Sequence, residues 1–479
     1  MFKQNIRIYI TMVIVSFIVA SCKVPAIVEP PAKQQVVPTT FAQQQDSTNS
    51  TTIPWRQFFT DTYLQALIDT ALHNNQELLI TLQEIEIAKN EVQVRDGKIR
   101  PSVGVKVGAD VDKVGRYTSQ GAGDAATEIE EGREMPDPLQ HYGAKLYANW
   151  EVDIWKKLHY AKAAAVSRYL STVEGKNFVL SNLIAEVANS YYELLALDNQ
   201  LEVVRQSITL QKNALEVVKI QKQAARVTEL AVQKFSAELL KSQSLEFVIK
   251  QQVKDAENKI SLLVGTYKSE VPRERSAFLQ IAPTIVHEGL PAQLLANRPD
   301  IKQAELELQA AKLDVKVARA EFYPSLDLSA AIGLEAFKPT YFAKLPESLL
   351  LNVAGDLAAP LVNRKGLKAE FASANARQLQ ALYNYERAIL RAYLEVSGDL
   401  SNVRNLESNL ALKNDQVVAL TKSIGVANDL FASARADYLE VLMTQRDVLE
   451  AKMELIETKK QQLLNVTNVY RDLGGGWQQ

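Results

Sequence analysis

Two stretches, KIRPSVGVKVGADVD (98–112) and EFYPSLDLSAAIGLE (321–335), set the architecture of this chain. Each follows a segment of helical character, turns at a Pro-Ser pair, and then alternates apolar with polar residues. Alternation with a period of two predicts a β-strand with two different faces. Proline lacks an amide hydrogen and disfavours helix in the residue before it, so each Pro-Ser pair marks a change from helix to strand.

The sequence around these stretches is repeated. Residues 74–109 align with 297–332 without a gap, and the identical pairs include Asn74 and Asn297, Ala88-Lys89 and Ala311-Lys312, Val92 and Val315, Val94 and Val317, and Pro101-Ser102 and Pro324-Ser325. A second alternating run follows in each half, at 142–155 and 349–362. The shared order predicts an internal duplication. We therefore expect a first repeat over 55–280 and a second over 281–479.

Long helices are predicted in both halves, because Leu, Ala, Glu, Lys and Gln dominate long stretches that lack proline. The expected spans are about 74–100, 156–221 and 227–264, then 298–323, 366–428 and 436–471. In each half the two shorter spans together match the long one, so we expect one long helix paired with two stacked shorter helices. The apolar seams of these helices are Val187, Leu194, Leu201, Ile208 and Leu215, and Leu439, Leu442, Leu449, Met453, Ile456 and Leu463. Such seams fit a coiled coil, and periodicity alone leaves a simple two-helix hairpin open.

The four alternating runs have two interpretations. Strands of about ten residues with this alternation are typical of a transmembrane β-barrel, and equally of a soluble sheet with one buried face. Four strands cannot close a barrel, and open edges are not tolerated in hydrocarbon. If the strands span a membrane, several chains must therefore combine them.

The N-terminus predicts export. Lys3 and Arg7 precede the apolar run IYITMVIVSFIVA, which has the length of a signal-peptide core, and VASC follows with the single cysteine of the chain, Cys22. We expect a lipoprotein signal peptide at 1–21, an acylated Cys22, and an extended tether over 22–54 that is rich in Pro, Gln, Ser and Thr. The alternative is that Cys22 is a stray thiol in a discarded leader.

The whole of 55–477 resembles the TolC-like outer-membrane efflux family, in its lipoprotein branch similar to OprM and the NodT group. The motifs that carry the resemblance are LPAQLLANRPDIKQAE (290–305), VARAEFYPSLDLS (317–329), YLEVLMTQRDVLEAK (438–452) and YRDLGGGW (470–477). The resemblance implies a homotrimer in the outer membrane, with a shared barrel of twelve strands and a periplasmic tunnel of twelve helices. It also implies a periplasmic adaptor protein and an inner-membrane pump, for which the trimer is a passive conduit for drugs or other toxic small molecules.

The same resemblance places functional residues at two helical turns. The tips that would face the adaptor are Thr228, Glu229 and Leu230 in the first half, and Asp437 and Tyr438 in the second. The pore gate would include Leu439, Glu440 and Arg446. The family often has an acidic residue where this chain has Met443, which leaves Glu440 as the nearest acid. Arg446 either braces a closed gate through an ion pair or is a solvated seam residue.

Other functions find little support in the composition. The formal charge is -2, so no basic excess indicates nucleic acid. We predict no enzyme activity, cofactor or metal site, because His73, His141, His159 and His287 are scattered and no ligand spacing exists. We expect the GGGW glycines to be a flexible chain end. A conduit for protein secretion or metal-ion efflux, and a lipid-anchored coiled-coil scaffold without a pore, stay open as alternatives.

Overall fold

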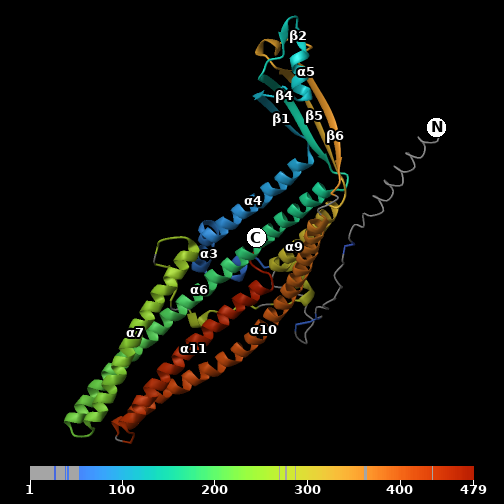
Figure 1. Cartoon of the computed structure of the whole chain (residues 1–479). Coiled ribbons are helices and arrows are strands. Elements are labelled where there is room, and N and C mark those ends of the chain that lie inside the picture. Colours follow the sequence, from blue (N-terminus) through green and yellow to red (C-terminus); the bar gives the residue numbers. More distant parts are fainter. Residues whose placement is uncertain are drawn as a thin grey trace. The chain divides into compact units, whose positions relative to one another are not determined.

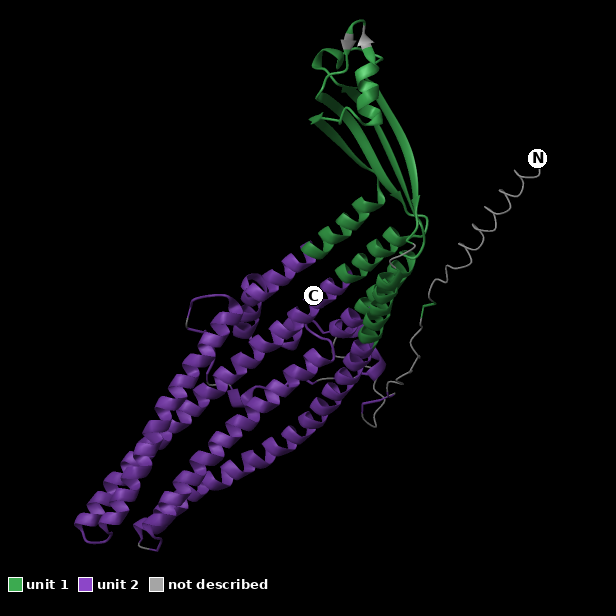
Figure 2. Cartoon of the chain, viewed as in Figure 1, with its two compact units in different colours: residues 1–32, 87–169, 306–382 green, residues 33–86, 170–305, 383–479 purple. Residues whose placement is uncertain are grey.

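The computed structural model describes residues 26–27, 38, 40–41, 53–268, 270–275, 278–285, 287, 289–360, 364–433 and 435–478. Cys22 and most of the predicted tether lie outside these residues. The chain forms two compact units (Figure 2): Met1–Ala32, Ile87–Tyr169 and Leu306–Leu382 make unit 1, and Lys33–Glu86, Leu170–Glu305 and Tyr383–Gln479 make unit 2. Each unit takes segments from both predicted repeats.

Helices make up most of the chain (Figure 1). They are α2 (Trp55–Phe58), α3 (Thr62–Asn74), α4 (Gln76–Ile99), α5 (Ser119–Ala126), α6 (Lys157–Gln223), α7 (Glu229–Val264), α8 (Leu294–Asn297), α9 (Pro299–Ala320), α10 (Arg364–Ala432) and α11 (Tyr438–Asp472). The six helical spans predicted from the sequence are confirmed. The long helices α6 and α10 have 67 and 69 residues, which is roughly 100 Å of helix each.

The helical seam of the first half forms the core of unit 2. Val187 and Leu194 are fully buried, and Leu201, Ile208 and Leu215 are each at most 9 % exposed. The helices α2 and α3, which the sequence reading missed, cover one end of this core. The Asp61 carboxylate caps α3 by accepting hydrogen bonds from the backbone amides of Tyr63 and Leu64, and from the Tyr191 hydroxyl. Among the described residues, no helix combines the length and apolar character that a bilayer crossing requires.

The shorter helices stack end to end, as predicted. The Asn75 side chain donates a hydrogen bond to the Leu263 carbonyl in the last turn of α7, where α3 gives way to α4. Gly265 follows with φ +70°, and a Cβ there would lie 2.5 Å from the Asn74 carbonyl oxygen. Only glycine fits such a close approach in the left-handed region.

The second half contains the same junction. Gly474 follows α11 with φ +99°, and a Cβ there would lie 2.6 Å from the Asn297 carbonyl oxygen, where α9 begins. The Trp477 indole donates to that same oxygen at 3.1 Å, and the Ser181 hydroxyl donates to the Gly475 carbonyl. The prediction of a flexible GGGW end is therefore wrong, because these glycines are buried and provide a close helix contact.

The four long strands form one antiparallel sheet in unit 1. They are β1 (Ser102–Asp112), β4 (Leu139–Val152), β5 (Ser325–Ala336) and β6 (Leu349–Ala358), in the order β1-β4-β5-β6. Both Pro-Ser pairs mark the start of a strand, as predicted. β4 begins and ends three residues before the predicted run 142–155. Asp153 follows its last residue, and the Asp153 carboxylate accepts hydrogen bonds from the Leu158 and His159 amides in the first turn of α6. β6 ends at Ala358, before the predicted 362.

A small substructure separates β1 from β4. It consists of α5 and a hairpin of β2 (Glu128–Glu130) and β3 (Arg133–Glu134). The Thr118 hydroxyl caps α5 by accepting a hydrogen bond from the Gly121 amide. This segment was not predicted from the sequence, because it is rich in glycine and charged residues and shows no sustained hydrophobic periodicity.

Candidate functional site

The four-stranded sheet has one continuous apolar face. Residues directly opposite each other in antiparallel strands project to the same side, so the register defines the two faces. One face carries Val103, Val105, Val107, Ala109 and Val111 of β1; Tyr142, Ala144, Leu146, Ala148, Trp150 and Val152 of β4; Leu326, Leu328, Ala330, Ile332, Leu334 and Ala336 of β5; and Leu349, Leu351, Val353, Gly355 and Leu357 of β6. The other face carries Lys106, Asp110, Lys145, Asn149, Asp327, Asn352 and Asp356 among its polar residues.

The apolar face is uncovered in the single chain. Val105, Leu146, Ile332 and Leu351 form one row across all four strands and are 68 %, 51 %, 51 % and 69 % exposed. A soluble sheet would cover such a face with a helix or a second sheet, because large exposed apolar patches promote association. This face therefore requires a partner or an apolar solvent.

Both edges of the sheet are also open in the single chain. Within the described part of the chain, β1 pairs only with β4, and β6 pairs only with β5. An edge strand presents a row of free amide and carbonyl groups that can template pairing with another strand. The sheet thus offers two complementary edges, β1 and β6, for pairing between copies.

The predicted adaptor-facing tips lie at one end of unit 2 (Figure 1), where the turn between α6 and α7 approaches the turn between α10 and α11. Thr228 and Asp437, which correspond in the two halves, are the N-cap residues of α7 and α11, and neither side chain makes a capping hydrogen bond. An apolar cluster joins the two turns: Leu215, Val218, Ala231, Phe235 and Val441, with Tyr438 and Leu442 packed against it. The structure therefore brings the two predicted tips together.

Charge at the first tip is held by local contacts. The Glu229 carboxylate forms an ion pair with Lys222 across the turn. It also accepts a 2.6 Å hydrogen bond from the side-chain amide of Gln233. The Lys222 hydrogen bond, followed by the Gln233 hydrogen bond, holds the pKa of the Glu229 carboxyl below its usual value. Leu230 beside it is 58 % exposed. The first tip therefore combines a fixed Lys222–Glu229 ion pair with an exposed leucine.

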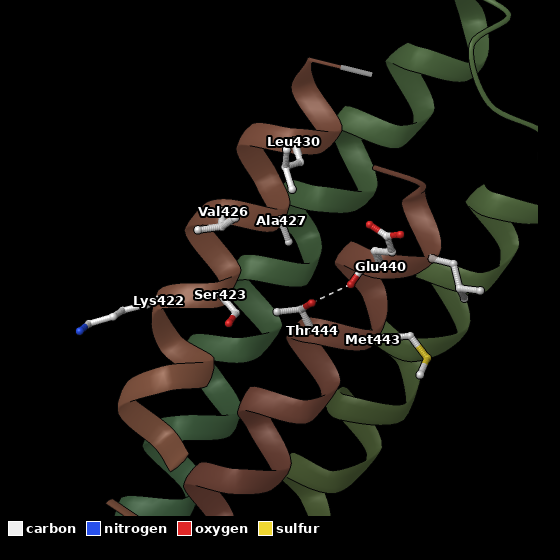
Figure 3. Close-up of a pocket in the computed structure, with 9 residues that line it drawn as sticks. Lys422, Ser423, Val426, Ala427, Leu430, Glu440, Met443 and Thr444 are labelled. Carbon is white, nitrogen blue, oxygen red and sulfur yellow. Dashed lines mark hydrogen bonds between the residues drawn. The ribbon is translucent and has the colours of Figure 1, made fainter. Parts of the chain in front are cut away.

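The predicted gate residues lie along the start of α11. Leu439 and Glu440 line a groove between α10 and α11, together with Met443 and Thr444 of α11 and Val426 and Leu430 among the residues of α10 (Figure 3). The Thr444 hydroxyl donates to the Glu440 carbonyl oxygen at 2.8 Å. Leu439 is 40 % exposed, whereas later seam residues such as Ile456 and Leu463 are buried. The apolar seam of α11 is thus more exposed to solvent near the tip than further along the helix.

Arg446 does not reach Glu440 within the chain. Its guanidinium lies 3.5 Å from the Asp447 carboxylate, and its side chain is 46 % exposed. An exposed ion pair of this kind contributes about 0 to 1 kcal/mol, so it leaves the guanidinium available to other partners.

A buried cluster of charged side chains around Arg298 was not predicted from the sequence. The Arg298 guanidinium is 5 % exposed and donates to the Asp300 and Glu395 carboxylates and to the Asp472 carbonyl. Burial acts to lower the pKa of Arg298, but the hydrogen bonds and charges of its acidic partners raise it overall. Beside it, burial and then the neighbouring Asp472 carboxyl raise the pKa of Asp399 to about 7. The NRPD and YRD motifs that supply Arg298 and Asp472 thus fasten α9 to the end of α11.

Residues 67–266 and 290–475 match the model of the family described as outer membrane efflux protein. The chain belongs to this family. Within the described part of this outer membrane efflux protein, no group of three or more His, Cys, Asp or Glu side chains could hold a metal ion. Its family members and structural neighbours are channel proteins rather than enzymes, and the resemblance identified from the motifs is confirmed.

Three curated relatives match nearly the whole chain. The pyoverdine export outer membrane protein OpmQ of Pseudomonas aeruginosa is 28 % identical, over 88 % of this chain and 87 % of its own length. The probable outer membrane lipoprotein SilC of Salmonella typhimurium is 27 % identical, over 96 % of this chain and 97 % of its own. The cation efflux system protein CusC of Escherichia coli is 26 % identical, over 89 % and 88 %.

The fold matches a solved CusC structure as well. That structure was described in connection with folding and transmembrane channel formation. It superposes on this chain with a TM-score of 0.80 at 23 % sequence identity, and the superposition covers 95 % of this chain and 99 % of the CusC chain. This likeness shows the fold. The outer membrane efflux protein described here is thus mainly helical with a small sheet, as its relative is.

Proposed function

We propose that three copies of this chain form the outer-membrane channel of a tripartite efflux system. Each copy contributes four strands to a barrel of twelve and its long helices to a periplasmic tunnel of twelve helices. The observation that carries the proposal is the sheet, which has a continuous apolar face and two unpaired edges. Both features are unfavourable in an isolated chain in water, and both are removed when copies close a barrel in lipid.

Barrel closure follows from the physical chemistry of the bilayer. An unpaired backbone group in hydrocarbon costs several kcal/mol, so a spanning sheet must close on itself. Strands of 10 to 14 residues have the length that a tilted transmembrane strand needs. Pairing β6 of one copy with β1 of the next removes every edge, and cyclic symmetry makes all such pairings equivalent.

The helical part would connect the barrel to the rest of the system. In this proposal the tips at Thr228, Glu229 and Leu230, and at Asp437 and Tyr438, meet the adaptor protein, which links the trimer to an inner-membrane pump. The pump supplies the energy, and the trimer is a passive conduit. The matching junctions at Gly265 and Gly474 support an origin of the two halves, 55–280 and 281–479, by duplication.

Lipid attachment would hold the N-terminus at the same membrane. We propose that residues 1–21 are a signal peptide and that Cys22 becomes the acylated first residue of the mature chain, followed by a tether to residue 54. The relative SilC is named a lipoprotein, which supports this assignment. One acyl-bearing residue per chain would add to the anchoring that the barrel provides.

The closed gate would involve Leu439, Glu440 and Arg446. Threefold symmetry brings three copies of the turn towards one axis, and three Glu440 carboxylates in a narrow passage repel one another. Among the described residues Arg446 pairs with Asp447 alone, across an exposed 3.5 Å contact, so its guanidinium can form an ion pair with an adjacent copy. In this proposal that ion pair braces the closed tip.

The relatives do not point to one substrate, because their names include pyoverdine export and cation efflux. The proposal therefore specifies a conduit for small toxic compounds and no single cargo.

Single-channel recording tests the proposal. Purified full-length protein is reconstituted in planar lipid bilayers, and its mass in detergent is measured by light scattering. We expect a trimer and discrete conductance steps, with rare opening because the tip is closed. A monodisperse trimer that never conducts, even after the 435–446 turn is loosened by substitution, would instead indicate a coiled-coil scaffold without a pore.

A further inference from the structure

The polar face of the sheet carries an acidic row and a pair of lysines at different positions along the strands. Across β4, β5 and β6, Glu151, Asp327 and Asp356 lie directly opposite one another, close to where the strands meet the helices. Across β1 and β4, Lys106 lies directly opposite Lys145. The two rows are six residues apart along β4, which corresponds to about 20 Å of strand.

The two lysines are side by side without an acidic partner. Residues directly opposite in an antiparallel pair have Cβ atoms about 5 Å apart, and like charges in this position are destabilising. Among the described residues no carboxylate lies within 4 Å of either ammonium group, although Glu335 lies in the next row of the same face and Asp110 in the row after that. Glu151, in contrast, is neutralised by the Lys157 ammonium at 2.5 Å.

Glycines leave space beside the lysine pair. Gly108 lies opposite Gly143 in the next row of the same face, and a Cβ at either position would meet no atom within 4 Å. Glu335 of β5 continues this row beyond Gly143, so the space without side chains lies between β1 and β4. Two adjacent ammonium groups that border this space can approach one anion together. Each ammonium offers three donors, and hydrogen bonds between charged groups are roughly twice as strong as neutral ones.

We propose that Lys106 and Lys145 form an anion-binding belt in the lumen of the channel, which takes solutes that carry several carboxylate or phosphate groups. This inference rests on the proposed trimeric barrel, in which three copies bring six lysines into one ring. Cargo that leaves the helical tunnel would pass the acidic row first and the lysine belt second. Because the lysines lie on the face opposite the lipid-facing one, the belt binds a solute and not a lipid headgroup.

Block by tripolyphosphate in planar bilayers tests the belt. The full-length channel is recorded in neutral lipid at low salt, with tripolyphosphate added on the side of the loop between β1 and β4. We expect tripolyphosphate to block the unmodified channel, and the Lys106→Gln/Lys145→Gln channel to need about a hundredfold more for half block, since two charge-assisted contacts are lost and each is worth about tenfold. The block should weaken as salt rises.

Control variants separate the belt from general charge effects. Lys113→Gln removes an exposed lysine just beyond β1 and should leave the block unchanged. Lys106→Arg/Lys145→Arg keeps the charge and should keep the block, which guards against a folding defect in the glutamine variant. Conducting channels in which the glutamine variant is blocked as strongly as the unmodified protein would overturn the belt and leave the channel intact. Failure of the trimer to conduct at all, even after the 435–446 turn is loosened by substitution, would overturn the proposed function, and the belt with it.

Discussion

Lysine substitution on the apolar face of β1 should prevent assembly of the trimer. Val105 is 68 % exposed and lies in the row with Leu146, Ile332 and Leu351. A lysine on the lipid-facing side of a barrel near the bilayer midplane costs about 2 to 4 kcal/mol. Three copies of Val105→Lys therefore cost the trimer about 6 to 12 kcal/mol, which is comparable with the stability of a whole domain.

The assay is the fraction of protein recovered as heat-modifiable trimer from outer membranes, measured on unheated gels. The matched control is Asn352→Lys, which places a lysine on the polar face of β6 one row away. We expect Val105→Lys to abolish the trimer band, and Asn352→Lys and Lys106→Gln to leave it intact. Equal tolerance of lysine at positions 105 and 352 would refute the lipid-facing assignment and favour a soluble sheet.

Three further predictions concern the gate, pH and the anchor. Arg446→Ala should raise the conductance of the isolated channel at low salt by loosening the closed tip, while Glu440→Gln should chiefly weaken cation preference; an unchanged Arg446→Ala conductance at both low and high salt would make Arg446 an ordinary seam residue. Between pH 3.8 and about 7 the Asp399 carboxyl is protonated in the folded chain and ionised in the unfolded chain. The contribution of Asp399 to the free energy of unfolding is therefore full below this range and is lost as pH rises through it. The loss is about 2 to 4 kcal/mol, the lower value allowing for partial solvent access, and thermal unfolding of Asp399→Asn from pH 4 to about 7 should show a flatter pH dependence; an unaltered slope would contradict the assigned pKa. Mass spectrometry of the mature chain should show diacylglycerol on Cys22, and an unmodified chain that begins elsewhere would contradict the anchor.

Periodicity predicted the helices and strands because their burial follows their sequence pattern. Val187 and Leu194 recur at heptad spacing and are fully buried in the structure. Pro101 and Pro324 were recognisable because proline breaks a helix by itself, whatever its surroundings. The C-terminal end of β4 was less predictable, because it depends on the Asp153 carboxylate, which accepts hydrogen bonds from the first-turn amides of the next helix. Element type is thus encoded locally, and element ends depend on specific contacts.

The close contacts between distant segments were not predictable in this way. The GGGW glycines suggested flexibility, yet Gly474 permits the approach of Asn297, which is far away in the sequence. The sequence around Arg298 likewise did not indicate a buried cluster with Asp472, because an Arg-Pro-Asp stretch is usually exposed to solvent. The lysine belt also required the register, because only the pairing of β1 with β4 places Lys106 opposite Lys145.

Cross-linking of β1 to β6 tests the trimeric barrel most directly. The two strands are opposite edges of one sheet with β4 and β5 between them, so they lie about 14 Å apart within a chain, beyond the reach of a disulfide. Gly108→Cys on β1 is combined in turn with Leu350→Cys, Asn352→Cys or Ala354→Cys on β6, and the membranes are oxidised. The account predicts that at least one pair yields covalent dimers and trimers on denaturing gels, with no larger species, and that either cysteine alone yields neither. Absence of cross-links for every pair, or a ladder that continues beyond three chains, would contradict a closed barrel of three copies.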